Sequence, residues 1–151
     1  RAAARLDGAL RRRGRERNAV ILNAKHGIGR TVRGEALVAN DGFSARYDLD
    51  RIKGVFSRPA HKLAGQSYVG KILVLDTAKG GVASSWMLHE MASRGVVPLA
   101  LVLNSVNPIL VQGAAFGNVT MLVGFDGDIT AKVPNGATVE INPAARTLRL
   151  L

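Results

Sequence analysis

The chain has 151 residues and a hydrophobic fraction of 47%, which is enough to bury the core of one globular domain and excludes general disorder. It contains no cysteine, so it carries no disulfide and no thiolate ligand for zinc or an iron–sulfur cluster. No apolar run approaches the roughly 20 residues of a membrane span, and the first residues lack the apolar core of a secretory signal. We therefore expect a cytoplasmic protein that binds no metal itself and contacts no membrane.

The net charge of +10 is unevenly spread, because residues 1–18 hold seven arginines against Asp7 and Glu16 and so contribute half of it. We expect residues 1–18 to be a basic N-terminal extension, either helical or disordered, and residues 19–151 to be the folded domain. A basic arm can meet nucleic acid or an acidic partner. No aromatic residue lies among the arginines to stack on bases and no nucleic-acid-binding motif follows them, so nucleic-acid binding is the weaker hypothesis.

The first half of the domain reads as short strands and loops. Residues 19–22 form an apolar run, residues 34–38 alternate weakly like a strand, and the Asn-Asp-Gly of residues 40–42 is a turn signal. Glycines and Pro59 interrupt every longer period between residues 42 and 70. That pattern predicts a long loop region of the kind that carries function, with one or two short strands.

A strand–helix–strand unit follows. Residues 72–75 are an apolar run between glycine loops and predict a buried strand. Ser84 or Ser85 can cap a helix that runs to about Arg94 and stops at Gly95. Residues 98–103 predict a second buried strand, parallel to the first and joined to it by a right-handed crossover.

The rest of the chain is rich in predicted strands. Asn107 and Pro108 read as the N-cap and first position of a short helix over residues 109–115. Strands are expected at residues 119–123, 138–141 and 147–150, with a tight turn at residues 134–136. Because helices and strands do not alternate regularly, the expected fold class is α/β with a β-rich core and one βαβ unit, without a doubly wound sheet.

The loop between the first buried strand and the helix could hold an anion. It has neither the Walker A order nor the third glycine of a dinucleotide fingerprint. Gly80 and Gly81 let a ligand approach the backbone, the helix N-terminus offers free N–H groups, and Lys79 adds a positive charge. Hydroxyls come from Thr77 and the serine pair. Composition alone nevertheless favours the alternative, an ordinary turn with a serine cap.

The other candidates for chemistry are weaker. His26, His61 and His89 are far apart in the sequence and form no metal-binding pair. His61, in a glycine-bounded loop, is the best placed for polar work, although a structural role is equally open. Asp126 and Asp128 lie in a glycine turn, where carboxylates usually serve the turn itself. The spacing supports no Ser-His-Asp triad.

Several of these stretches, taken in order, resemble one family. The run GQSYVGKILVL, residues 65–75, resembles the G-x-S-x-x-GKILVL of the small subunit of aconitase X-type dehydratases. Ser44 falls where the family has a serine in its first ligand loop, and His61, Leu63 and Gly65 match its His-x-Leu-x-Gly. Further similar stretches are residues 34–38, 76–90, 98–103 and 136–141. The resemblance covers about residues 28–143 and leaves the basic arm outside.

This resemblance implies a swivelling β/β/α domain with a barrel-like core, like the mobile domain of aconitase but on a separate chain. It implies a hydro-lyase subunit that closes over a large catalytic subunit, which holds the iron or iron–sulfur cluster. Known members dehydrate phosphomevalonate or cis-3-hydroxy-L-proline, so the expected substrate is a small hydroxy acid. The expected substrate contacts are Ser44, His61, Thr77, Lys79, Gly80 and Gly81.

The sequence departs from the family in the loop that matters most. In the family a basic residue and a glycine are followed by two serines, one of which is thought to abstract the proton. Here Lys79 and Gly80 match, but Gly81 and Val82 stand in place of the serines. The expected catalytic hydroxyl therefore moves to Ser85 or Ser84; the alternatives are a base of another type or one supplied by the partner subunit. The alternative is a non-catalytic binding or regulatory module of the same fold with a degenerate loop.

Overall fold

The computed structural model describes residues 20–45, 47–78, 82–106, 108, 111, 115 and 119–151, with the backbone alone for residues 82–85. The expected basic extension of residues 1–18 and most of the expected helix over residues 109–115 lie outside the described residues. No helix within the described ranges is long and apolar enough to cross a membrane.

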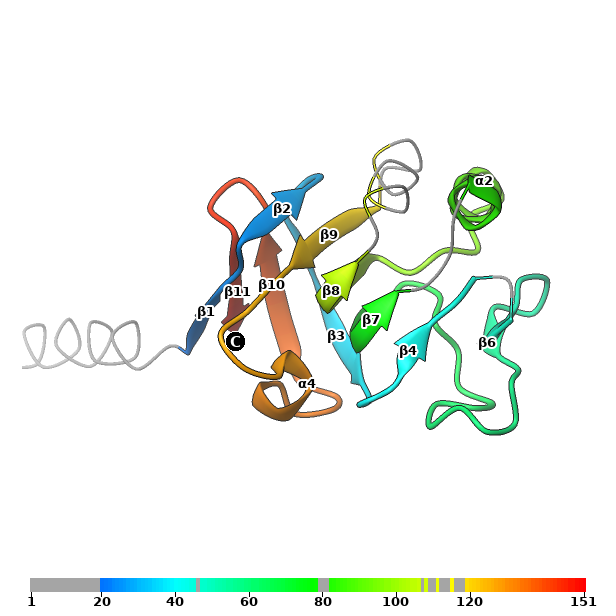
Figure 1. Ribbon diagram of the computed structural model, residues 1–151, viewed down its shortest axis with the longest axis horizontal. Coiled ribbons are helices and arrows are strands. Elements are labelled where there is room, and N and C mark those ends of the chain that lie inside the picture. Colours follow the sequence, from blue (N-terminus) through cyan, green and yellow to red (C-terminus); the bar gives the residue numbers. More distant parts are fainter. Residues whose placement is uncertain are drawn as a thin grey trace, which may run out of the picture.

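Strands dominate the domain (Figure 1). The strands are β1 (Ile21–Asn23), β2 (His26–Ile28), β3 (Val32–Val38), β4 (Gly42–Phe43), β5 (Leu49–Asp50), β6 (Val55–Phe56), β7 (Ile72–Ala78), β8 (Ala100–Val106), β9 (Thr120–Val123), β10 (Thr138–Asn142) and β11 (Thr147–Leu150). The helices are α2 (Val82–Ser93) and the short α4 (Ile129–Lys132).

The main sheet closes on itself. Its strand order is β1-β11-β10-β3-β7-β8-β9-β2, with β4 beside β7. Only Ala24 and Lys25 separate β1 from β2, yet β1 pairs with β11 and β2 pairs with β9, so one bent segment supplies both edges. The result is a mixed barrel, which confirms the expected α/β class with a barrel-like core. Closure leaves few strand edges free to pair with other chains.

The central strands β7 and β8 are buried on both faces, which explains their unbroken apolar runs. Ile72 and Val74 join the cluster inside the barrel, where α4 lies across one end with Ile129 in the same cluster (Figure 1). Leu73 and Leu75 alternate with them and pack in the second cluster, which includes Leu88 and Met91 of α2, a helix drawn beside β7 and β8. Two cores therefore share the same two strands.

The expected βαβ unit is confirmed, because β7 and β8 are parallel and α2 connects them. The helix ends at Ser93 and the chain turns at Gly95, which has a φ of 71°. The strands expected at residues 34–38, 119–123, 138–141 and 147–150 are present within two residues. Residues 42–70 hold three short strands, one more than expected, and β2 and α4 are additional elements.

Barrel closure yields the first testable prediction, at Gly27 in the closing strand β2. A Cβ added at this position would lie 2.5 Å from the carbonyl oxygen of Pro143, in the turn between β10 and β11. That oxygen belongs to backbone and cannot move aside cheaply. We expect Gly27→Ala to lower the free energy of unfolding by about 1–3 kcal/mol, measured by urea denaturation.

Gly42→Ala is the matched control for this experiment. Its added Cβ would lie 3.6 Å from the carbonyl oxygen of Thr77, an ordinary contact, and Gly42 does not need a positive φ. We expect a change below about 1 kcal/mol. Equal stability of Gly27→Ala and the unmodified chain would contradict the packing of β2 against the β10–β11 turn.

Candidate functional site

The candidate site lies at the carboxyl ends of three parallel strands. Gly42 of β4 pairs with Thr77 of β7, and Thr77 pairs with Ser105 of β8. Each of the three strands ends one residue after these paired residues, at Phe43, Ala78 and Val106. Open α/β sheets bind ligands beyond the carboxyl ends of parallel strands, where loops and helix N-termini meet. This edge is therefore the part of the domain best suited to a small polar ligand.

Two hydroxyl groups face each other on this edge. The Thr77 hydroxyl donates to the carbonyl of Ser105 at 3.2 Å, and the Ser105 hydroxyl donates to Thr77 Oγ1 at 3.0 Å. Both protons are used in this arrangement, so the pair keeps only lone pairs for a ligand. It suits a substrate hydroxyl better than a carboxylate. Ser105 was not anticipated from the sequence, because the strand predicted there ended at residue 103, whereas β8 continues to Val106.

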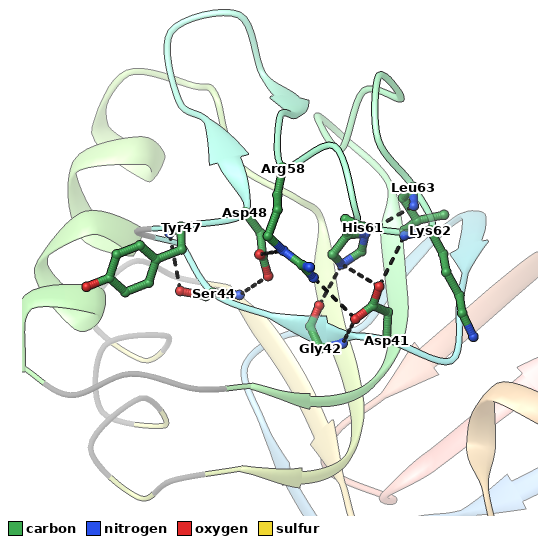
Figure 2. Close-up of polar contacts among 9 residues, drawn as sticks. All are labelled: Asp41, Gly42, Ser44, Tyr47, Asp48, Arg58, His61, Lys62 and Leu63. Carbon is green, nitrogen blue, oxygen red and sulfur yellow. Dashed lines mark hydrogen bonds and ion pairs between the residues drawn. The ribbon is translucent and has the colours of Figure 1, made fainter.

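Ser44 follows β4 and is held by its own loop. Its backbone N–H donates to Asp48 Oδ2 at 2.9 Å, and its Oγ accepts from the backbone N–H of Tyr47 at 3.3 Å. The Arg58 Nε donates to the other oxygen of Asp48 at 2.5 Å (Figure 2). Because the Ser44 hydroxyl acts here as an acceptor, its proton remains able to donate to an anionic ligand.

His61 is buried and engaged on both ring nitrogens. Nε2 lies 2.7 Å from the carbonyl oxygen of Gly42, and Nδ1 accepts from the backbone N–H of Leu63 at 3.0 Å (Figure 2). Because Nδ1 accepts, the neutral ring carries its proton on Nε2 and donates it to Gly42. The ring also stacks on Phe56, with the centroids 4.6 Å apart. This geometry makes His61 a brace that holds the end of β4, and direct contact with substrate stays a prediction.

The Asp41 carboxylate accepts hydrogen bonds from several neighbouring donors. It accepts from the backbone N–H groups of Gly42 at 2.8 Å and Lys62 at 3.1 Å, and from Arg58 at 3.4 Å. Burial opposes ionisation, but the N–H groups of Lys62 and Gly42, and then the charge of Arg58, outweigh it and lower the pKa of Asp41. The carboxylate therefore ties the β4 turn to the His61 loop (Figure 2).

One amide joins the strand ends to α4. Asn104 Nδ2 donates to Asp76 at 3.0 Å and to Asp128 at 2.9 Å, while its Oδ1 accepts from the backbone N–H of Ile129 at 2.8 Å. Hydrogen bonds from Asn104 and Thr130 lower the pKa of Asp128, against a small effect of burial. Asp128, which was expected to serve a turn, is the N-cap of α4. Asn104 was not expected to have a role, although a polar residue directly after an apolar run was the available signal.

The remaining site residues are placed only in part. Lys79, Gly80 and Gly81 lie outside the described residues, and so do the side chains of Ser84 and Ser85, whose backbone forms the first turn of α2. Thr77 leads directly into this loop. By register, Ser44 follows the pair of Phe43 with Ala78, so it lies beside the start of the same loop. The catalytic and substrate-binding assignments remain predictions.

Metal-ligating side chains do not gather within the described ranges, where no three of His, Asp or Glu lie close enough to hold an ion. His26 lies in β2, and His89 lies on α2 against the exposed Trp86, with the rings 6.1 Å apart edge to face. These two histidines are thus separate from the His61 cluster.

The fold is thus a mixed α/β barrel with a polar edge at the carboxyl ends of its parallel strands. The family model described as the aconitase X swivel domain matches residues 21–150. The chain therefore belongs to the aconitase X swivel domain family.

Curated relatives and solved structures agree with this assignment. The chain is 30% identical to the phosphomevalonate dehydratase small subunit of Methanopyrus kandleri over 76% of its own length and 85% of the relative's. It is 29% identical to the subunit of the same name from Pyrococcus horikoshii, over 83% and 92%. Aconitase X from Thermococcus kodakaraensis, in its holo-form, has the same fold, with a TM-score of 0.80 at 23% identity, covering 87% of this chain and 98% of that one.

The brace formed by His61 gives a second prediction. His61→Ala removes the partner of two backbone groups and leaves a hole against Phe56. We expect it to lower the free energy of unfolding by about 3 kcal/mol, measured by chemical denaturation. His89→Ala, an exposed histidine on α2, is the control and is expected to change it by less than about 0.5 kcal/mol. Similar effects of the two substitutions would contradict a bracing role for His61.

A third prediction concerns pH. The pKa of Asp41 is below 3.8 in the folded chain, so its contribution to stability is complete above 3.8 and disappears as the pH falls through the lowered value. We expect Asp41→Asn to reduce the melting temperature by a few degrees near neutral pH. The difference from the unmodified chain should narrow below pH 3.8. A difference that is constant across this range would refute the ionised role of Asp41.

Proposed function

We propose that the chain is the small, swivelling subunit of an aconitase X-type dehydratase, a hydro-lyase that acts with a large catalytic subunit on a small hydroxy acid. The observation that carries this proposal is the family match over residues 21–150, joined to a polar strand edge with the hydroxyls of Ser44, Thr77 and Ser105. Curated relatives bearing the name of such a small subunit support it.

In this proposal the carboxyl edge binds and orients the substrate. The Ser44 hydroxyl donates to a carboxylate oxygen, and the lone pairs of Thr77 and Ser105 accept from a substrate hydroxyl. Lys79 and the backbone at Gly80 and Gly81 hold the anionic end of the substrate. The braced histidine, His61, keeps the β4 end in place through Gly42. Closure of the domain over the large subunit then excludes water from the site.

Proton abstraction is assigned to a serine in the first turn of α2. Ser85 or Ser84 would take the proton from the carbon next to the substrate carboxylate. The electrons of that C–H bond form the carbon–carbon double bond while the C–O bond breaks, and the hydroxyl leaves as hydroxide with the electron pair of the C–O bond. A serine alkoxide needs a strongly lowered pKa, to which the positive charge of Lys79 and the free N–H groups of the helix N-terminus would contribute.

The cofactor belongs to the partner in this proposal. The chain has no cysteine, and its described residues do not bring three other metal ligands together, so they do not fit an iron–sulfur cluster. The large subunit would hold the iron or cluster, which supplies Lewis-acid assistance to the departing hydroxyl. Because the relatives are named for phosphomevalonate, that compound is the first substrate to test, and cis-3-hydroxy-L-proline is the second.

The alternative function is a non-catalytic module of the same fold, and one specific observation favours it. Gly81 and Val82 occupy the positions of the family's serine pair. Such a module would still bind the large subunit but would not support dehydration. Restoring the pair with Gly81→Ser and Val82→Ser would then create activity that the unmodified chain lacks.

The fourth prediction tests the serines directly. We expect the chain, co-expressed with an aconitase X-type large subunit, to dehydrate one of the two candidate substrates. The Ser84→Ala/Ser85→Ala variant should lose at least about a hundredfold in kcat, the scale of a general base. Ser93→Ala, at the far end of α2, is the control and should retain activity. Full activity in the double variant would remove serine from the mechanism, and an inactive but stable complex of the unmodified chain would favour the alternative module.

A further inference from the structure

The turn between β5 and β6 presents an aliphatic side chain to solvent between two cations. Ile52 is 83% exposed, the largest value among the exposed large hydrophobic residues within the described ranges. Arg51 and Lys53 flank it, and neither forms an ion pair with another described residue. Single exposed apolar residues are common on protein surfaces, so exposure alone assigns no role to this one.

The backbone of the turn is held by hydrogen bonds to Asp50, which distinguishes it from an open loop tip. Asp50 Oδ1 accepts from the backbone N–H groups of Ile52 and Lys53, both at 3.0 Å, and the N–H of Gly54 donates to the Asp50 carbonyl at 2.9 Å. The hydrogen bonds from Lys53 and Ile52 lower the pKa of Asp50. Gly54, with a φ of 73°, lies so close to Val69 that an added Cβ would be 2.5 Å from its side chain. A turn whose backbone is already held in this way loses little backbone freedom on binding.

The foot of the same hairpin belongs to the candidate site. Asp48 directly precedes β5, and Arg58 is the second residue after β6. Their ion pair, with Arg58 Nε 2.5 Å from Asp48 Oδ1, lies beside the Ser44 loop, whose backbone Asp48 also holds (Figure 2). The hairpin therefore connects the tip, through Asp48 and its ion pair with Arg58, to the loop that holds Ser44.

We propose that the turn of residues 51–53, the hairpin tip, docks on an acidic face of the large subunit that has an apolar pocket for Ile52. Arg51 and Lys53 would meet carboxylates around that pocket. This inference rests on the proposed function for the existence of the partner. The chemistry of the tip favours a protein over an anionic membrane, because one aliphatic side chain buries too little area to anchor on lipid while a pocket can enclose it fully.

The test measures binding of the tip variants to the large subunit by calorimetry, at two salt concentrations. We expect Ile52→Asp to weaken binding by about tenfold or more, and Arg51→Glu/Lys53→Glu to weaken it most at low salt. Leu151→Asp, a second exposed aliphatic residue, and Arg149→Glu, on β11, are the matched controls and should bind as the unmodified chain does. Because Ile52 is exposed, the melting temperature of Ile52→Asp should be unchanged.

The outcomes separate this inference from the proposed function. If the unmodified chain forms no complex with the large subunit, the proposed function fails and the tip inference fails with it. If it forms a complex that both tip variants form equally well, the tip inference alone is overturned. Loss of binding on Trp86→Ala without any loss on Ile52→Asp would overturn it too, by placing the contact on α2. Tip-dependent binding to phosphatidylserine vesicles, with no effect on the complex, would replace the protein partner with a membrane.

Discussion

Parallel pairing of β7 with β8, buried on both faces, is the constraint on which the rest of the domain depends. Alternate residues of these strands serve two different cores, one inside the barrel and one beneath α2. Because the register is fixed from Ile72 with Ala100 to Ala78 with Val106, the strand ends are fixed as well. The hydroxyl pair of Thr77 and Ser105 and the start of the loop before α2 inherit their positions from this packing.

The central unit could be predicted because its signals are local. Strands buried on both faces read as continuous apolar runs, and the helix between them carries its own stop at Gly95. The short elements escaped prediction for the opposite reason. The three residues of β2 contain a glycine and form a strand only through pairing with β9, and α4 is one turn fixed by Asp128 and by the distant Asn104. Tertiary contacts decide both.

In the candidate site, too, some residues could be predicted from local sequence signals and others depend on tertiary contacts. Register alone could bring Thr77 to the strand edge, because the residue follows a recognisable buried run. The brace at His61 could not be foreseen, since its partner Gly42 is 19 positions away and the choice between a ligand-facing and a structural histidine depends on burial. The family resemblance predicts which loop faces the substrate, but it does not determine which hydroxyl acts when Gly81 and Val82 stand in place of the family's two serines.

The closing segment of the barrel has a consequence for how the chain reaches its fold. Residues 21–28 are translated before β9 and β11, the strands with which they pair. The barrel thus cannot close until β11 has been translated, and contacts so distant in sequence are slow to form. Until then the apolar face of the first strands stays open to other chains. Assembly of this domain is therefore set by its final strand.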